Sequence, residues 1–147
     1  MSEATVTYRG TVYPHQCDHM GHMNVMWYVG KFDEASWQLL SACGLTPSRM
    51  RRDAIAMAAV EGHITFRREL YAGDVISVRS EIVDVGKTSV RMAHQMRNDE
   101  TGEIVASMIV VGVHLDAGTR KACPLPPDVR ERMGDDVEQD TADLVVS

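Results

Sequence analysis

Residues 24–44 read NVMWYVGKFDEASWQLLSACG, and apolar side chains recur in this stretch at spacings of three and four residues. Asn24 is a favoured helix N-cap residue, and Gly44 stands where a C-terminal glycine is expected. The pattern predicts a long helix over residues 24–43. Its apolar stripe comprises Val25, Tyr28, Val29, Phe32, Ala35, Leu39, Leu40 and Cys43, widened by Met26, Trp27 and Trp37. The rest of the domain must therefore wrap around this helix.

The sequence leads to a separate prediction for each of two helix residues, Lys31 and Gly30. Lys31 falls among the polar residues on the other side of the helix, which predicts exposure to solvent. Gly30 in mid-helix costs about 1 kcal/mol relative to alanine, so we expect another backbone or a ligand to pass close to it.

Five further segments have the composition of strands, over residues 5–13, 58–70, 75–85, 88–98 and 104–116. Short glycine-containing connections separate the last three, which predicts an antiparallel meander. Residues 104–113 are apolar on both faces, so both faces must be covered. One long helix covers one face, and the other face, or an edge, then requires a second subunit. The predicted class is α+β, with a five-stranded antiparallel sheet wrapped around one helix.

The composition indicates one domain of an ordinary globular protein, over residues 1–133 of the 147. Residues 134–147 are predicted to be an acidic, flexible tail, which accounts for much of the net charge of −6. The nearly neutral remainder offers no basic surface for nucleic acid. No apolar run is long enough for a membrane span and no signal peptide is recognisable, so we expect a cytoplasmic protein without a membrane partner.

The densest polar cluster is HQCDHMGHMN, residues 15–24, directly before the long helix. Unpaired N–H groups and the helix dipole favour negative charge at such a terminus. Asp18 is expected to be ionised there and to act as a nucleophile or general base, although an aspartate that only caps a turn is the alternative. His15, His19 and His22 lack the spacing of a helical metal site, and the three cysteines lack a CxxC pair. We therefore predict no metal and no cofactor.

The motif Asp18-x-x-Gly21-His22-x-Asn24, followed by Tyr28 and Ala35, resembles that of the hotdog-fold acyl-CoA thioesterases of the 4-hydroxybenzoyl-CoA thioesterase type. The resemblance continues through HITF at residues 63–66, the glycine-aspartate turn at 73–74 and CPLP at 123–126. It implies a hotdog fold, hydrolysis of an acyl-CoA thioester, and assembly as a homodimer or homotetramer with active sites built from two chains.

The resemblance also implies roles for individual residues. Asp18 would be the catalytic carboxylate, and the backbone N–H of Val25 would polarise the thioester carbonyl. His22 and Asn24 of the motif would contact the substrate. Gln16 stands where many members have a further aspartate, which leaves the role of that acid open. Glu61, expected at the start of its strand, would approach the loop containing Asp18 of a partner chain, and a solvated acid at a strand end is the alternative.

An anionic protein needs local cations to hold the phosphates of coenzyme A. The preferred candidates are Arg49, Arg51 and Arg52, in an expected loop after the helix, with Arg67 and Arg68 as a second cluster. Two other functions stay open. One is a non-catalytic hotdog protein that binds acyl-CoA or an acyl-carrier protein. The other is a hotdog hydratase, whose Asp-x4-His pattern is not met because only three residues separate Asp18 from His22.

Overall fold

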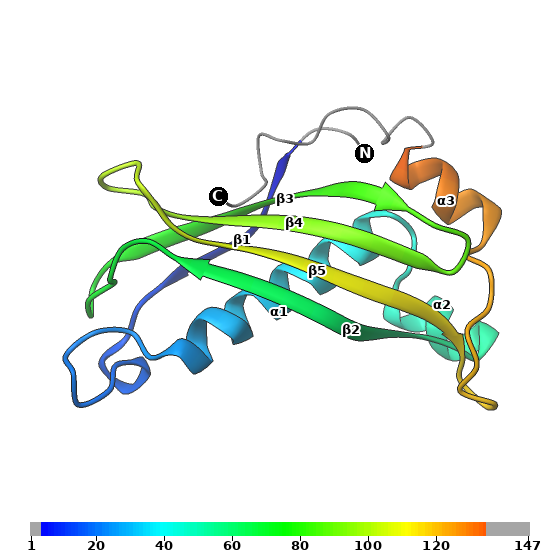
Figure 1. Ribbon diagram of the computed structural model, residues 1–147, viewed down its shortest axis with the longest axis horizontal. Coiled ribbons are helices and arrows are strands. Elements are labelled where there is room, and N and C mark those ends of the chain that lie inside the picture. The colour runs from blue at the N-terminus through cyan, green and yellow to red at the C-terminus, as the bar shows by residue number, and fades with distance from the viewer. Residues whose placement is uncertain (1–3, 135–147) are drawn as a thin grey trace.

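The computed structural model describes residues 4–134, and these form one curved antiparallel sheet that wraps around a long helix (Figure 1). The strands are β1 (Thr5–Thr11), β2 (Ile55–Phe66), β3 (Val75–Val85), β4 (Ser89–Asn98) and β5 (Ile104–Asp116). The helices are α1 (Val25–Ala42), α2 (Pro47–Asp53) and α3 (Pro127–Met133), with a single 3-10 turn at Pro14–Gln16. The predicted α+β hotdog fold is confirmed. The predicted tail lies, apart from Gly134, outside the described residues.

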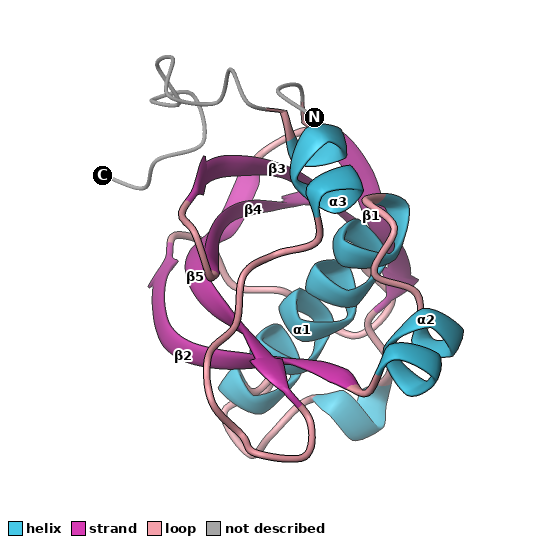
Figure 2. Cartoon of the chain, turned by 90° about the vertical axis from the view of Figure 1, so that its right-hand side faces the viewer, coloured by secondary structure: helices cyan, strands magenta, loops and turns pink. Residues whose placement is uncertain are grey.

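The strands lie in the order β1-β3-β4-β5-β2, and every neighbouring pair is antiparallel. The predicted meander is therefore confirmed for β3, β4 and β5. Figure 2 shows α1 running along the inside of the curved sheet. Phe32, Ala35 and Leu39 of α1 are fully buried against it. No helix among residues 4–134 combines the length and apolar character needed to cross a membrane.

The expected exposure of Lys31 was wrong. For Gly30, no backbone among the described residues passes close, and the expected ligand stays a prediction. Helix α1 packs mainly on β1 and β3, which covers the side that carries Lys31. The Lys31 ammonium lies 5.3 Å from the centre of the Tyr8 ring and donates a hydrogen bond to the Tyr8 hydroxyl at 3.3 Å. Nothing described lies within 4 Å of the position that a Cβ on Gly30 would occupy. Helix α1 sits off-centre in the sheet, over β1 and β3. The polarity of its residues alone therefore did not predict which side of the helix the sheet covers.

The segment after α1 was expected to be a loop, and it is the helix α2 instead. Thr46 caps it by accepting a hydrogen bond from the backbone N–H of Arg49, and Pro47 occupies the first turn. This is a standard helix start, in which proline loses no hydrogen bond. Ala54 ends the helix in the left-handed conformation, with φ of 53°. The next strand, β2, consequently begins at Ile55 and ends at Phe66, earlier at both ends than predicted.

Strand β2 forms one edge of the sheet. Within the described chain it pairs only with β5, over 12 residues and with a bulge between Ala59 and Glu61. Val60 and Phe66 on this strand are 61% and 46% exposed. A long edge strand with exposed apolar side chains is a surface that another chain can pair with.

Candidate active site

The loop before α1 is held in one conformation by its own backbone. Cys17 and Met23 form an antiparallel bridge, and the N–H of Asp18 donates to the carbonyl of His22 at 3.2 Å. The N–H of Gly21 donates back to the carbonyl of Asp18 at 3.0 Å. Gly21 has φ of +91°, a conformation that favours glycine. The motif glycine therefore closes a tight turn, with Asp18 at its start and the first turn of α1 at its end.

Both carboxylate oxygens of Asp18 accept hydrogen bonds. Oδ1 accepts from the backbone N–H of Met20 at 2.9 Å, and Oδ2 accepts from Nδ2 of Asn24 at 2.8 Å. The bond from Asn24 is the largest cause that lowers the pKa of Asp18 below its usual value, followed by the bond from Met20. The aspartate is therefore ionised at neutral pH, as the sequence predicts.

Asn24 bonds at both ends of its side-chain amide. Its Oδ1 accepts from the backbone N–H of Met26 at 2.9 Å and so caps α1. Because that N–H can only donate, Oδ1 must face it, and the NH2 group must then face Asp18. The amide is thus occupied by Asp18 and by the helix, which makes Asn24 a positioning residue in this chain. Its predicted contact with substrate stays untested.

Val25 is the first residue of α1, and its side chain is 56% exposed. Among the described residues its backbone N–H finds no acceptor, since the cap takes the N–H of Met26 and the carbonyl of Asn24 takes that of Trp27. This N–H stands at the positive end of the helix dipole. An acceptor that develops negative charge is stabilised at such a place.

An open groove of about 640 Å³ begins at Val25 and runs past Tyr28 to the segment that follows β2. Phe66, Arg67 and Arg68 form its other side. His22 also lines the groove, whereas Asp18 does not. The loop that contains both residues therefore borders only one end of the groove. The groove gives an elongated substrate a place to lie beside the N-terminus of α1.

The other groove residues form a small polar network. His22 Nε2 lies 3.2 Å from Oε2 of Glu69, and the Tyr71 hydroxyl donates to the same oxygen at 3.1 Å. The rings of His22 and Tyr71 meet edge to face. His22 is thereby held at the groove, which is consistent with its predicted contact with substrate but does not test it.

Glu61, which was predicted to bind substrate, and Gln16, which departs from the family pattern, both lie outside the groove. Glu61 is exposed in the middle of β2 and not at its start, and its carboxylate makes no hydrogen bond or ion pair with any described residue. Gln16 is buried, and its Oε1 accepts from the backbone N–H of Tyr13. Gln16 therefore holds the 3-10 turn together. Within a single chain Glu61 has no part in the loop.

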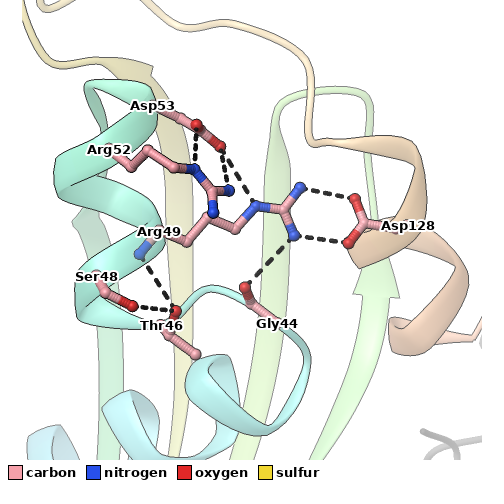
Figure 3. Close-up of polar contacts among 7 residues, drawn as sticks. All are labelled: Gly44, Thr46, Ser48, Arg49, Arg52, Asp53 and Asp128. Atoms are coloured by element: carbon pink, nitrogen blue, oxygen red, sulfur yellow. Dashed lines mark hydrogen bonds and ion pairs between the residues drawn. The ribbon is translucent and has the colours of Figure 1, made fainter.

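The arginines predicted to hold phosphate are in α2, at the opposite end of α1 from Asp18 (Figure 1). Helix α1 has 18 residues and is roughly 27 Å long, so its two ends are far apart. Arg49 makes a two-bond contact with Asp128 of α3, at 2.6 and 2.7 Å, and Arg52 pairs with Asp53 (Figure 3). Two of the three guanidinium groups are therefore occupied, and Arg51 is exposed. Their predicted role in binding coenzyme A stays untested.

No group of three or more His, Cys, Asp or Glu side chains among residues 4–134 is arranged to hold a metal ion. His15 packs against Tyr13 and Trp27, and His22 is turned toward Glu69, so these histidines do not converge. Arg67 and Arg68 line the groove. In the sequence they stand out only as two adjacent basic residues. The position of the end of β2 beside α1 places them at the groove, and a sequence pattern does not give that position.

The comparisons with known proteins identify the family of the chain. The model of the thioesterase-like superfamily matches residues 12–133. The betainyl-CoA thioesterase of Pseudomonas aeruginosa is 22% identical over 133 residues, which cover 90% of this chain and 84% of that protein. The long-chain acyl-CoA thioesterase FadM of Escherichia coli K12 is 26% identical over 76% of this chain and 84% of that protein.

The fold comparison points the same way. A Staphylococcus aureus protein solved in complex with coenzyme A superposes with a TM-score of 0.83 and 21% identity, over 88% of this chain and 82% of that one. At this level of identity the similarity establishes the fold. With the family match over most of its length, the chain belongs to the thioesterase-like superfamily, and the thioester hydrolase predicted from the sequence is confirmed.

Proposed function

We propose that this thioesterase hydrolyses acyl-CoA, with Asp18 as its catalytic carboxylate and the Val25 N–H as the donor to the thioester oxygen. The observation that carries the proposal is the placement of an ionised carboxylate beside a helix N-terminus whose first N–H has no acceptor among the described residues. A thioester carbonyl that accepts from Val25 is polarised, and the oxyanion formed on attack is stabilised by the same N–H.

The low pKa of Asp18 favours the nucleophilic role. A general base works best with a pKa near the working pH, and hydrogen bonds from Asn24 and Met20 move Asp18 further below that range. As a nucleophile, a carboxylate oxygen attacks the thioester carbon, the C–S bond breaks, and the CoA thiolate leaves and takes up a proton. Water then hydrolyses the mixed anhydride to the free acid and regenerates the carboxylate.

The general-base route is the alternative. In that route Asp18 takes a proton from a water molecule that attacks the carbonyl directly, and no acyl group is ever attached to the protein. Rapid acid quenching followed by mass spectrometry separates the two. The nucleophilic route gives protein acylated at Asp18 together with an initial burst of free thiol. Equal rates of thiol and acid release, without acylated protein, establish the general base instead.

The anionic part of coenzyme A is assigned to the groove that begins at Val25. Arg67 and Arg68 line it, and Arg68 is exposed and paired at its Nε with Glu103 at 3.2 Å. Surface ion pairs of this kind contribute little and exchange readily for a phosphate. These two arginines are therefore better placed for the nucleotide than Arg49, Arg51 and Arg52 at the far end of α1.

The open edge of β2 supports assembly as a homodimer, alone or as part of a homotetramer. Two copies that pair along β2 would complete the hydrogen bonds of the edge and cover Val60. Such pairing would also bring the middle of β2, with Glu61, to a neighbouring chain. The predicted approach of Glu61 to the partner's loop belongs to this proposal.

Release of free thiol from a panel of acyl-CoA thioesters tests the function. The panel should span short, long, aromatic and charged acyl groups, because the acyl groups named for the two curated relatives differ. Turnover of at least one member, lost in Asp18→Asn, supports the proposal. Tight binding of acyl-CoA without any thiol release would instead favour the non-catalytic binding protein.

A further inference from the structure

A second pocket, separate from the groove at Val25, lies between the middle of α1 and strands β2, β4 and β5. Its volume is about 160 Å³, close to the roughly 150 Å³ of a cavity that admits a molecule of the size of benzene. The pocket exists because α1 sits over β1 and β3, and because Gly112 and Ala58 leave room on the sheet. Val29, Leu40 and Met108 make most of its wall apolar.

Ser36 is a polar residue that lines this pocket, and it is only 9% exposed. Ser36 Oγ lies 2.7 Å from Nε2 of His94, and Nδ1 of His94 bonds to Oγ of Ser80. Ser80 Oγ lies 2.7 Å from Oγ1 of Thr7, which bonds to the carbonyl of Val78. These side chains form one buried hydrogen-bonded row.

The donor and the acceptor of each hydrogen bond in the row can be assigned by starting from its last member, the carbonyl of Val78. The carbonyl of Val78 can only accept, so Thr7 donates to it and accepts from Ser80. Ser80 then accepts from Nδ1–H of His94. Burial lowers the pKa of His94 to about 4, so its ring is neutral and Nε2 carries no proton. Ser36 must therefore donate to His94, and it offers the pocket only an oxygen lone pair.

Asp33 and Trp37 stand on the same side of α1, four residues apart, and both line the pocket. Neither side chain makes a hydrogen bond, ion pair or ring contact with any described residue. Trp37 is 42% exposed. A carboxylate and an indole face are both attractive to a cation, and aromatic side chains of this kind bind quaternary ammonium groups.

We propose that this pocket binds the positively charged end of a cationic acyl group, with Asp33 and Trp37 as the residues that select it. The proposal rests on the proposed acyl-CoA hydrolysis and names its substrate class. Apart from the indole N–H, the polar features that the lining side chains present are electron-rich: the Asp33 carboxylate, the Ser36 lone pair and the Trp37 ring. A trimethylammonium group is compact enough for the volume, and its methyl groups suit the apolar wall.

The spacing to the thioester sets the length of the acyl group. Asp33 is eight residues after Val25, which is roughly 12 Å along the helix. Helical side chains lean toward the N-terminus, which brings the carboxylate closer to Val25. Val29, four residues from each of them, lines the same pocket as Asp33. A spacer of about three methylene groups between carbonyl and ammonium suits this separation.

The test compares two thioesters that differ in one atom: 4-(trimethylammonio)butanoyl-CoA and its neutral counterpart 5,5-dimethylhexanoyl-CoA, in which carbon replaces the nitrogen. We expect kcat/KM to be at least about tenfold higher for the cation. In Asp33→Asn and Trp37→Leu this ratio should fall at least about fivefold, whereas Trp37→Phe should keep most of it. Glu34→Gln, the same charge change one residue from Asp33 and outside the pocket, should leave the ratio unchanged.

An equal or lower kcat/KM for the cation in the unmodified protein would overturn the proposal. So would an equal fall of the ratio in Asp33→Asn and in Glu34→Gln, since that would reflect net charge and not the pocket. Hydrolysis of neither thioester would count against the proposed acyl-CoA substrate instead. Calorimetric titration with free 4-(trimethylammonio)butanoate then still tests the pocket, because binding lost in Asp33→Asn supports it and no binding contradicts it.

Discussion

The Asn24 side chain joins the Asp18 carboxylate to the first turn of α1, donating to Oδ2 of Asp18 at 2.8 Å and accepting from the Met26 N–H at 2.9 Å. One amide therefore does two things: it caps the helix, and it fixes and acidifies the carboxylate beside that helix. A residue that can only cap would keep the helix start but release Asp18. The two functions are separable by substitution.

Asn24→Ser separates them. The serine hydroxyl can still accept from the Met26 N–H, so the melting temperature should change little. The bond to Asp18 is lost, and the pKa of Asp18 should rise toward its usual value. The acid limb of the kcat/KM profile, where activity falls as Asp18 is protonated, should therefore move to higher pH. Asn24→Ala should show the same shift together with a lower melting temperature. An unchanged acid limb in both variants would mean that Asp18 does not control it.

Arg67 and Arg68 are predicted to hold the anionic end of coenzyme A. Contacts to phosphate are made in the ground state and the transition state alike, so Arg67→Ala with Arg68→Ala should raise KM several-fold with little change in kcat. The increase should shrink at high salt, where exposed charges are screened. The matched control is the triple variant of Arg49, Arg51 and Arg52. If the triple variant raises KM and the double variant does not, the nucleotide lies at the α2 end.

Arg49 has a structural role through Asp128. The two bonds from Arg49 lower the pKa of Asp128 to about 2 in the folded protein. A carboxylate with a depressed folded-state pKa stabilises the fold above its unfolded pKa, and that stability is lost as the pH falls toward 2. Asp128→Asn should therefore lower the melting temperature at pH 7, with a difference that shrinks below about pH 4. In an Arg49→Gln background the same substitution should have little effect. An undiminished effect there would exclude the pair as its cause.

The edge of β2 is predicted to be a subunit interface. Val60→Lys places a charge at the exposed bulge of this edge without touching the described core. A charged side chain there opposes pairing with a second copy, so light scattering should show a shift toward the monomer mass of 16.3 kDa. Activity should fall with it. A monomer with full activity, in the variant or in the unmodified protein, would contradict a site built from two chains.

More of the fold than of the candidate site could be predicted from the sequence. Residues 24–43 and the short glycine turns were sufficient for one helix and a meander, because periodicity and turn length are local properties. The burial of Lys31 was missed because it depends on which strands α1 covers. Helix α2 was predicted as a loop although Thr46-Pro47 is a recognisable helix start, because its seven residues include no buried side chain and so show no apolar period.

Asp18 could be singled out from the sequence because the motif places it next to a helix start. The groove could not, because Arg67 and Arg68 meet Val25 only through the pairing of β2 with β5. The hydrogen-bonded row from Ser36 to Thr7 could not be predicted either, because it joins α1 and β1 to the distant hairpin of β3 and β4.

The most direct test of the account is kcat for acyl-CoA hydrolysis by Asp18→Asn. Asparagine keeps the size of the side chain and an oxygen that can accept from Met20, so circular dichroism and oligomeric mass should match the unmodified protein. Loss of the carboxylate should lower kcat by at least about a hundredfold, the lower end of what such groups contribute. Turnover within a few-fold of the unmodified enzyme, in a folded and assembled variant, would remove Asp18 from the mechanism.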